Sequence, residues 1–380
     1  MMRCYKKICL IVTLGFLFVA ISPEHKVDAA TLYVQSEEVP SDIKETAKLN
    51  WEGYLQNMLY LENSNLTDYY LGEPFTIEYS DSVTYNFPII KNKNKEISYI
   101  LQVNKNNQQT EYSIALTQAI AKQLEKVSKE LSTTSNQAIY LKGNVQNVYY
   151  EFKETKQALI LGDNNIIEAE EIRDEQDVMS KDITQKFAVP KNSMLRSVVE
   201  FDHNILPWKS YELQGVQPWC HFFSIAAIIN YQAGKQVTSA SSLVHGTHPN
   251  ATESQLMDTN WIVNKTNYMD VINYTNKKYK MNIKYDPTKV PFAKVKSEIS
   301  ANAPLAAVLR DYEGKSAGHA INVVGYTAPK NGDINTYPPY YYYWNPWWEE
   351  IFVVSSSSAY MTLGQTKYKW NETEYNYRYK

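Results

Sequence analysis

The sequence predicts two α+β domains, the second holding one long buried helix followed by a run of strands. Three observations support this prediction. The chain has 380 residues, 44% of them hydrophobic, which is enough for two ordinary cores. Apolar residues recur at helical spacing in some segments and form short β-rich runs in others. Six acids and one base lie within residues 168–177, and such a charge run is normally solvated, so we place a connector near residues 163–182.

The charge balance argues against a nucleic-acid partner. The chain has 38 Lys and Arg against 41 Asp and Glu, so it has no basic excess. Residues 30–196 hold 17 basic and 24 acidic residues, a net charge of -7, whereas residues 197–380 hold 17 and 15, a net charge of +2. This complementarity suits a removable segment that covers the other half, the alternative being two unrelated domains on an acidic linker.

Residues 1–29 are typical of an export signal. Arg3, Lys6 and Lys7 form a charged start, an apolar stretch follows, and a small-residue site ends at Ala29. The apolar stretch is too short for a membrane anchor, and no later segment approaches a run of about 18 apolar residues. We therefore expect a secreted, extracellular product without a membrane segment, whose single remaining thiol is Cys220.

The first domain, residues 30–196, carries no recognisable chemistry. Apolar residues at four-residue spacing predict a helix from Ser41 to Leu59, and a similar pattern predicts a second helix over residues 113–131. Strands are predicted at 82–90, 97–103, 138–141 and 145–152. This domain has no Cys and no His, so a regulatory or folding role fits it better than catalysis.

The second domain, residues 197–380, is predicted to begin with an apolar helix over residues 219–231 that ends at Gly234. Strands follow at 304–309, 320–326, 340–344 and 351–354. Ten of the 31 tyrosines lie between Tyr337 and Tyr379. We interpret them as residues that pack on the faces of a sheet, the alternative being a carbohydrate-binding platform.

Cys220 lies where a loop turns into this helix. A thiol there faces the positive end of the helix dipole, which favours the thiolate over the thiol. The helix is hydrophobic on almost every side, so its start must open at an internal cleft. Cys220 is thus a candidate nucleophile, although a small buried core residue would fit the same position.

His319 is the best candidate for the base, because it opens the predicted strand after Gly318 and a strand end is a rigid place for a catalytic group. The other histidines fit less well: His25 leaves with the signal, His203 lies in a predicted tail, His221 points about 100° away from Cys220, and His245 with His248 forms an H-x-x-H pair that has no third metal ligand.

Two further residues complete the candidate site. Asn345 ends the aromatic strand and precedes Pro346, so a rigid turn holds an amide that can orient His319. Gln214, six residues before Cys220, could place its side-chain amide beside the Cys220 N–H to hold an oxyanion.

These motifs resemble the papain clan of cysteine peptidases, and the staphopains most closely. The resemblance covers residues 197–380 and rests on Trp219-Cys220, on Gly318-His319-Ala320 and on the turn over residues 344–347. It implies that Cys220 is the nucleophile, His319 the general base and acid, Asn345 the orienting residue and Gln214 the oxyanion donor. It also implies a papain-like two-lobed domain, a helical lobe plus an antiparallel barrel-like sheet, preceded by an α+β propeptide. His221 departs from the small or aromatic residue usual after the nucleophile.

The sequence thus predicts a secreted zymogen of a cysteine endopeptidase that needs no cofactor and no metal and is a virulence factor. Expected partners are protein or peptide substrates, the chain's own propeptide as inhibitor and a dedicated protein inhibitor, with a monomeric enzyme. Activation is expected to cleave between about Met194 and His203. The alternatives are a Cys/His amidase that cuts peptidoglycan and a non-catalytic adhesin or inhibitor on the same fold.

Overall fold

The computed structural model describes residues 31–380 apart from 60–63, 81, 106–110, 132–137, 145–147, 153–154, 159–178, 188–199, 315–317 and 331–337. The expected signal and the acidic run therefore lie outside the described residues.

In the first half these elements are β1 (Tyr33–Ser36), α1 (Ser41–Leu59), the 3-10 helix η1 (Leu66–Asp68), β2 (Tyr69–Leu71), β3 (Phe75–Glu78), β4 (Val83–Lys91), β5 (Ile97–Lys105), β6 (Tyr112–Thr117), α2 (Ala119–Leu131), β7 (Ile139–Gly143), β8 (Val148–Phe152), β9 (Thr155–Ala158) and β10 (Met179–Asp182). The second half holds β11 (Phe201–Ile205), α3 (Cys220–Ala233), α4 (Ala240–Thr247), α5 (Glu253–Met257), α6 (Thr259–Lys265), α7 (Tyr268–Tyr279), β12 (Lys284–Asp286), α8 (Phe292–Ser300), β13 (Leu305–Asp311), β14 (His319–Pro329), β15 (Tyr340–Trp344), β16 (Ile351–Ser355), β17 (Met361–Leu363) and β18 (Thr366–Tyr375).

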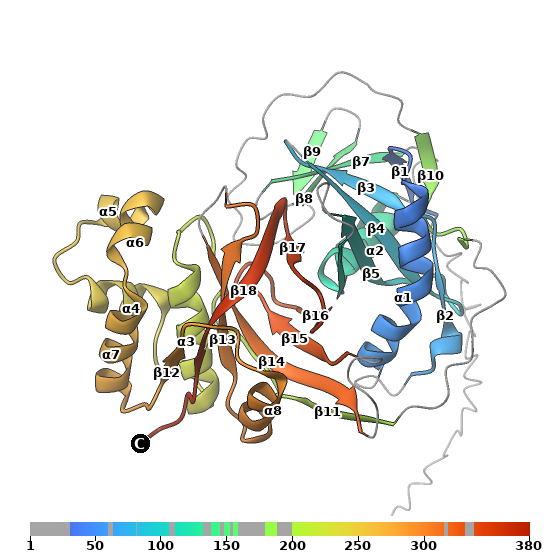
Figure 1. The fold of residues 1–380 in the computed structure, drawn as a ribbon. Helices are drawn as coiled ribbons and strands as arrows, with labels where there is room; N and C mark the ends of the chain where they lie inside the picture. Colours follow the sequence, from blue (N-terminus) through green and yellow to red (C-terminus); the bar gives the residue numbers. More distant parts are fainter. Residues whose placement is uncertain are drawn as a thin grey trace, which may run out of the picture.

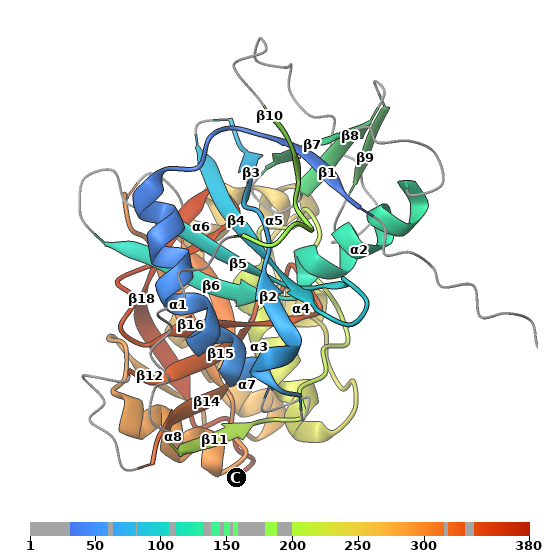
Figure 2. The same ribbon diagram turned by 90° about the vertical axis from the view of Figure 1, so that its right-hand side faces the viewer.

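An antiparallel sheet forms the centre of the second half and continues into the first (Figures 1 and 2). Its strands follow the order β18, β13, β14, β15, β16, β6, β5, β4, in which β16 of the second half pairs with β6 of the first. The pairing of β16 with β6 aligns Phe352 with Thr117 and Val354 with Ala115. The two halves therefore share backbone hydrogen bonds as well as side-chain contacts.

Helix α3 lies between the sheet and helices α4–α7 (Figure 1). Its apolar residues pack on all sides, as expected for a helix that is hydrophobic all round. Gly234 ends it in the left-handed conformation at φ 65°, which glycine adopts without a steric penalty. None of the helices in the described part of the chain is long and apolar enough to cross a membrane.

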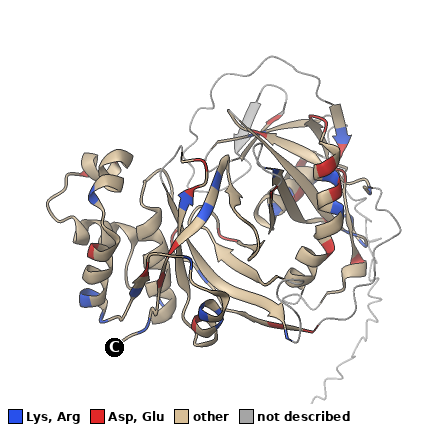
Figure 3. Cartoon of the chain, in the orientation of Figure 1, with Lys and Arg blue, Asp and Glu red and all other residues tan. Residues whose placement is uncertain are grey.

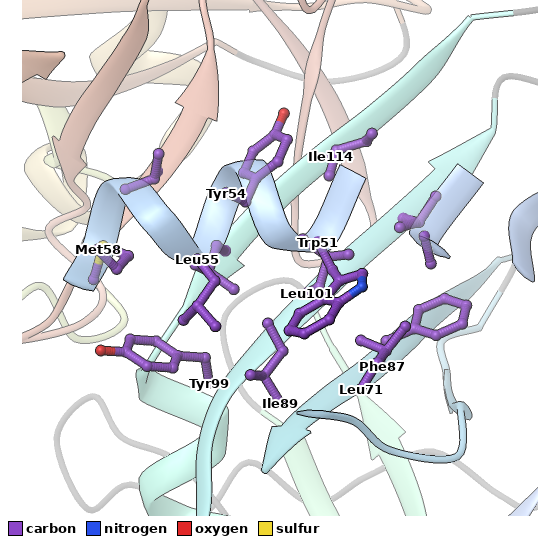
Figure 4. Packing of buried hydrophobic residues seen from close by; sticks show 14 of the residues in the cluster. Trp51, Tyr54, Leu55, Met58, Leu71, Phe87, Ile89, Tyr99, Leu101 and Ile114 are labelled. Atoms are coloured by element: carbon purple, nitrogen blue, oxygen red, sulfur yellow. The ribbon is translucent and has the colours of Figure 1, made fainter. Parts of the chain in front are cut away.

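Strand β15 is covered on both faces. Tyr341 and Tyr343 belong to the apolar core of the second half. Tyr342 and Trp344, on the opposite face, share a core with α1 of the first half. Figure 4 shows the side of this core to which α1 contributes Trp51 and Leu55. The Tyr342 hydroxyl donates a hydrogen bond of 2.7 Å to the Asn57 carbonyl at the end of α1. These tyrosines are therefore buried by sheet packing, as predicted, and present no exposed carbohydrate platform.

Charged residues of both signs occur on both halves (Figure 3). Lys122 of α2 forms an ion pair of 3.2 Å with Glu350, just before β16. The same side of the first half also contacts Trp348, which packs against its second apolar core. The first half thus lies against the turn that follows Asn345.

Three sequence predictions were wrong. The predicted helix over residues 113–131 is strand β6 followed by helix α2, because residues 112–117 pair on both sides, with β5 and β16. His203 lies in strand β11 opposite Thr327, not in a tail. The second half also contains helices between residues 240 and 300 that the prediction of one helix and then strands did not include.

Candidate active site

Cys220 is the first residue of α3, as predicted. One turn later, the Ser224 hydroxyl donates to the Ala320 carbonyl (2.9 Å), and the Asn322 amide donates to the Ser224 carbonyl (3.1 Å). All these atoms are buried, so the two bonds fix the start of α3 against the start of β14. These bonds therefore fix the position of Cys220, the candidate nucleophile, relative to strand β14, which carries His319.

His319 and Asn345 form a hydrogen-bonded pair. The His319 Nε2 lies 3.0 Å from the Asn345 Oδ1, so Nε2 donates and Nδ1 is left as the atom available to a thiol. The Trp347 backbone N–H also donates to this oxygen (3.1 Å), which fixes the orientation of the amide. The Trp347 ring stacks on the imidazole with centroids 4.1 Å apart and shields the pair from water.

Gly318 lets β14 approach β13 closely at this point. A Cβ atom at residue 318 would lie 2.5 Å from the Leu309 carbonyl oxygen, which real structures do not tolerate. Leu309 is the residue paired with His319 across the two strands. The position of His319 in the site therefore requires glycine, which has no side chain, at residue 318.

Burial shifts both candidate catalytic groups toward their neutral forms. Although Cys220 is partly exposed, packed atoms around its sulfur desolvate it and raise the pKa of the thiol, only partly offset by a hydrogen bond from the Ala320 backbone. Desolvation also lowers the pKa of His319 to about 4, against the opposing effect of Asn345. The raised pKa of Cys220 is opposite to the thiolate expected at the helix start, because desolvation outweighs the backbone hydrogen bonds at Ala320, His221 and Cys220.

The lowered pKa of His319 predicts a pH-dependent stability. The pKa of His319 is 6.5 in the unfolded chain and about 4 in the folded chain, so the unfolded chain binds a proton at His319 first as the pH falls. His319 thus contributes stability above pH 6.5 that is lost toward pH 4, about 3 kcal/mol at about 1.4 kcal/mol per pKa unit.

A His319→Gln variant tests this in a Cys220→Ala background, which prevents self-cleavage. The unfolding free energy of both proteins is measured by chemical denaturation at pH 7 and at pH 4. Its decrease from pH 7 to pH 4 should be about 3 kcal/mol smaller in the His319→Gln protein than in the protein that keeps His319. Equal drops in the two proteins would contradict the assignment of this titration to His319.

Gln214 lies beside the other candidates, but its amide already has one partner. Its backbone N–H donates to the Pro346 carbonyl (2.8 Å), which ties it to the turn after Asn345. Its side-chain Nε2 donates to the Gln217 carbonyl (2.6 Å), on the loop that leads into α3. The second N–H of this amide is the one left for an oxyanion. The structure therefore brings Gln214 next to the site.

A cavity of about 140 Å³ opens beside Cys220 and His319. Its wall includes residues that the sequence did not single out, from α6, α7 and β13: Ile262, Val263, Thr266, Tyr268 and Arg310. Only the fold brings them there, and no motif marked them.

The remaining histidines have other partners. His221 also lines the cavity and bonds to the buried carboxylate of Glu374 at 2.7 Å. His245 bonds to Glu253, and His248 to Thr266. Across the residues that the structure describes, no three His, Cys, Asp or Glu side chains gather as a metal site requires.

A cysteine at a helix start and a buried His–Asn pair that meet at one cavity define the class of cysteine hydrolases. Residues 28–190 match the family model of the staphopain proregion, and residues 197–377 match that of the staphopain peptidase, C47. The chain therefore belongs to the staphopain family of cysteine peptidases.

Individual relatives are more distant. Staphopain B of Staphylococcus aureus is 23% identical over 244 residues, which is 59% of this chain and 59% of that relative. Staphopain B of strain MSSA476 is 23% identical over 317 residues, 77% of this chain and 76% of the relative. The match thus spans less than two thirds of the first relative's length.

Proposed function

We propose that the chain is the zymogen of a secreted cysteine endopeptidase, with a two-lobed peptidase domain over residues 197–380. The observation that carries this proposal is the meeting of Cys220 with the Asn345-held His319 at one cavity. The family membership supports the choice of peptide bonds as substrates.

In the proposed reaction, His319 Nδ1 takes the proton of Cys220, and the sulfur attacks the substrate carbonyl carbon. The Cys220 backbone N–H and the second N–H of the Gln214 amide stabilise the oxyanion. The imidazolium then gives its proton to the leaving amine, and the C–N bond breaks. Water, activated by the same imidazole, releases the acyl group and restores the thiol. Asn345 holds the ring through Nε2 while it gains and loses this proton.

The contacts of the first half support a restraining role. Strand β6 extends the sheet at β16, and the hydroxyl of Tyr54 in α1 accepts a hydrogen bond from the Ser355 backbone (3.3 Å). Trp348 and Glu350, just after Asn345, contact the same half. A substrate chain could not pass over that turn while the first half is bound. Removal of residues 30–196 would uncover this turn, next to Asn345, for a substrate chain.

The secreted full chain tests this proposal. It should clear casein and not purified cell wall in zymograms, and N-terminal sequencing of the clearing species should give a start between Met194 and His203. Clearing of cell wall alone would indicate a peptidoglycan amidase instead. No activity on either, with no labelling of Cys220 by an epoxide thiol inhibitor, would indicate a binding protein. An active species that starts near residue 30 would contradict the proposed restraint.

A further inference from the structure

The cavity beside Cys220 has a polar wall that the reaction itself does not use. The described residues that line it all belong to the second half. Its volume of about 140 Å³ is several times the ~30 Å³ that one water occupies in the liquid. The cavity is therefore large enough for one substrate side chain next to the bond that is cut.

Two basic side chains line this cavity, and each has one hydrogen-bonding atom without a partner among the described residues. Arg310 donates from Nε (3.0 Å) and Nη2 (2.6 Å) to the Glu372 Oε1, and its Nη1 has no hydrogen-bond partner among the described residues. His221 is 7% exposed and bonds through Nε2 to Glu374, while its buried Nδ1 has no partner there either. Nε2 faces a carboxylate and therefore donates to it, and in the neutral tautomer this leaves Nδ1 as an acceptor.

Two carboxylates of β18 hold these basic groups in place. Glu372 and Glu374 are two residues apart on one strand, so both side chains leave the same face. The second oxygen of Glu372 accepts from the Tyr285 hydroxyl, and that of Glu374 accepts from the Tyr377 hydroxyl, each at 2.6 Å. Both oxygens of each carboxylate are thereby engaged, and each basic side chain is kept in one orientation.

The wall thus offers one fixed donor, Arg310 Nη1, and one fixed acceptor, His221 Nδ1. The other side of the cavity is apolar, with Ile262 and Val263. A carboxamide on a short apolar stem matches this combination, since its oxygen accepts and its nitrogen donates. A carboxylate lacks the donor and would lie near Glu372 and Glu374.

We propose that this cavity selects peptide substrates with a glutamine side chain beside the scissile bond, a specificity that rests on the proposed peptidase function. The glutamine oxygen accepts from Arg310 Nη1, and its nitrogen donates to His221 Nδ1. Leucine has a similar size but leaves the buried His221 Nδ1 and the partly exposed Arg310 Nη1 without a partner, and sites built to bind a polar group reject ligands that leave such a group unpaired.

The test uses the full chain after its activation, with internally quenched peptides. Each of the three positions before and after the scissile bond holds in turn glutamine, leucine or glutamate. At one position glutamine should exceed both others in kcat/KM by about tenfold. Arg310→Met and Arg310→Lys should both lower this glutamine-to-leucine ratio toward one, since neither keeps the fork that places Nη1.

The matched control is Arg378→Met. Arg378 is bonded to Glu298 and does not line the cavity, so both the ratio and the rate should stay as in the wild type. Glutamine without advantage at every position in an active enzyme overturns the inference, as does an unchanged ratio in both Arg310 variants. A wild type that cuts none of the peptides and no casein overturns the proposed function and the inference together.

Discussion

Replacement of Cys220 with alanine is expected to abolish casein hydrolysis, lowering kcat/KM on the order of 10⁴- to 10⁶-fold. No other described cysteine is present to take over the attack. The change removes one partly exposed sulfur and leaves the bonds between Ser224 and β14 intact, so the chain should fold as before. Because the precursor cannot process itself, it should also accumulate at full length.

The measurement is casein hydrolysis together with a thermal melt of the purified variant. Ser297→Ala, on the exposed surface of α8, serves as the matched control and should keep wild-type activity. Hydrolysis at the wild-type rate by the Cys220→Ala protein would remove the basis of the proposed reaction. A folded protein that does not hydrolyse casein and stays at full length would support the proposed reaction.

Replacement of Gly318 with alanine should lower activity by about 10²-fold, the effect of a displacement of about 1 Å at a catalytic group. The new Cβ would lie 2.5 Å from the Leu309 oxygen, and that atom belongs to the backbone and cannot rotate away. The start of β14 must therefore shift, and His319 with it. We also expect a destabilisation of about 1–3 kcal/mol, as for other overpacked sites.

Gly314→Ala gives a matched control on the same connection between β13 and β14. Its φ of 72° makes alanine strained, but no atom that the structure describes beyond the chain neighbours lies within 4 Å of the new Cβ. It should cost about 1 kcal/mol of stability and leave kcat/KM within about twofold of wild type. Steady-state kinetics and denaturation of both variants separate the two effects. Equal activity losses in both would mean that loop strain, not the contact with Leu309, disturbs His319.

Local sequence patterns predicted most elements because each pattern depends on near neighbours. The four-residue spacing from Ser41 to Leu59 is the buried face of α1. The unbroken apolar run after Cys220 is α3, and Gly234 ends it. The pattern over residues 113–131 was misleading, since Leu116 fits a helix face as well as a strand. Residues 112–117 form strand β6 because they pair with residues of β16 that lie 235 or more positions later in the sequence.

The same division holds for the site. The sequence alone identified Cys220, His319, Asn345 and Gln214, because each stands at a helix start, a strand end or a turn that a local motif marks. It could not identify Arg310, Tyr268 or the carboxylates of β18, since no local pattern distinguishes them from surface residues. Their role depends on β13, β18 and α7 meeting beside α3.

The sequence could not predict how burial shifts the pKa values of the candidate catalytic groups. From the sequence, the helix start favoured a thiolate at Cys220, since the dipole is a local property of the helix. Desolvation depends on everything packed around the sulfur and the imidazole, and it raises the pKa of Cys220 and lowers that of His319. The sequence by itself thus determined which groups are candidates for the chemistry. Only the tertiary structure decided the direction of their pKa shifts and their surroundings, because both arise from contacts between distant parts of the chain.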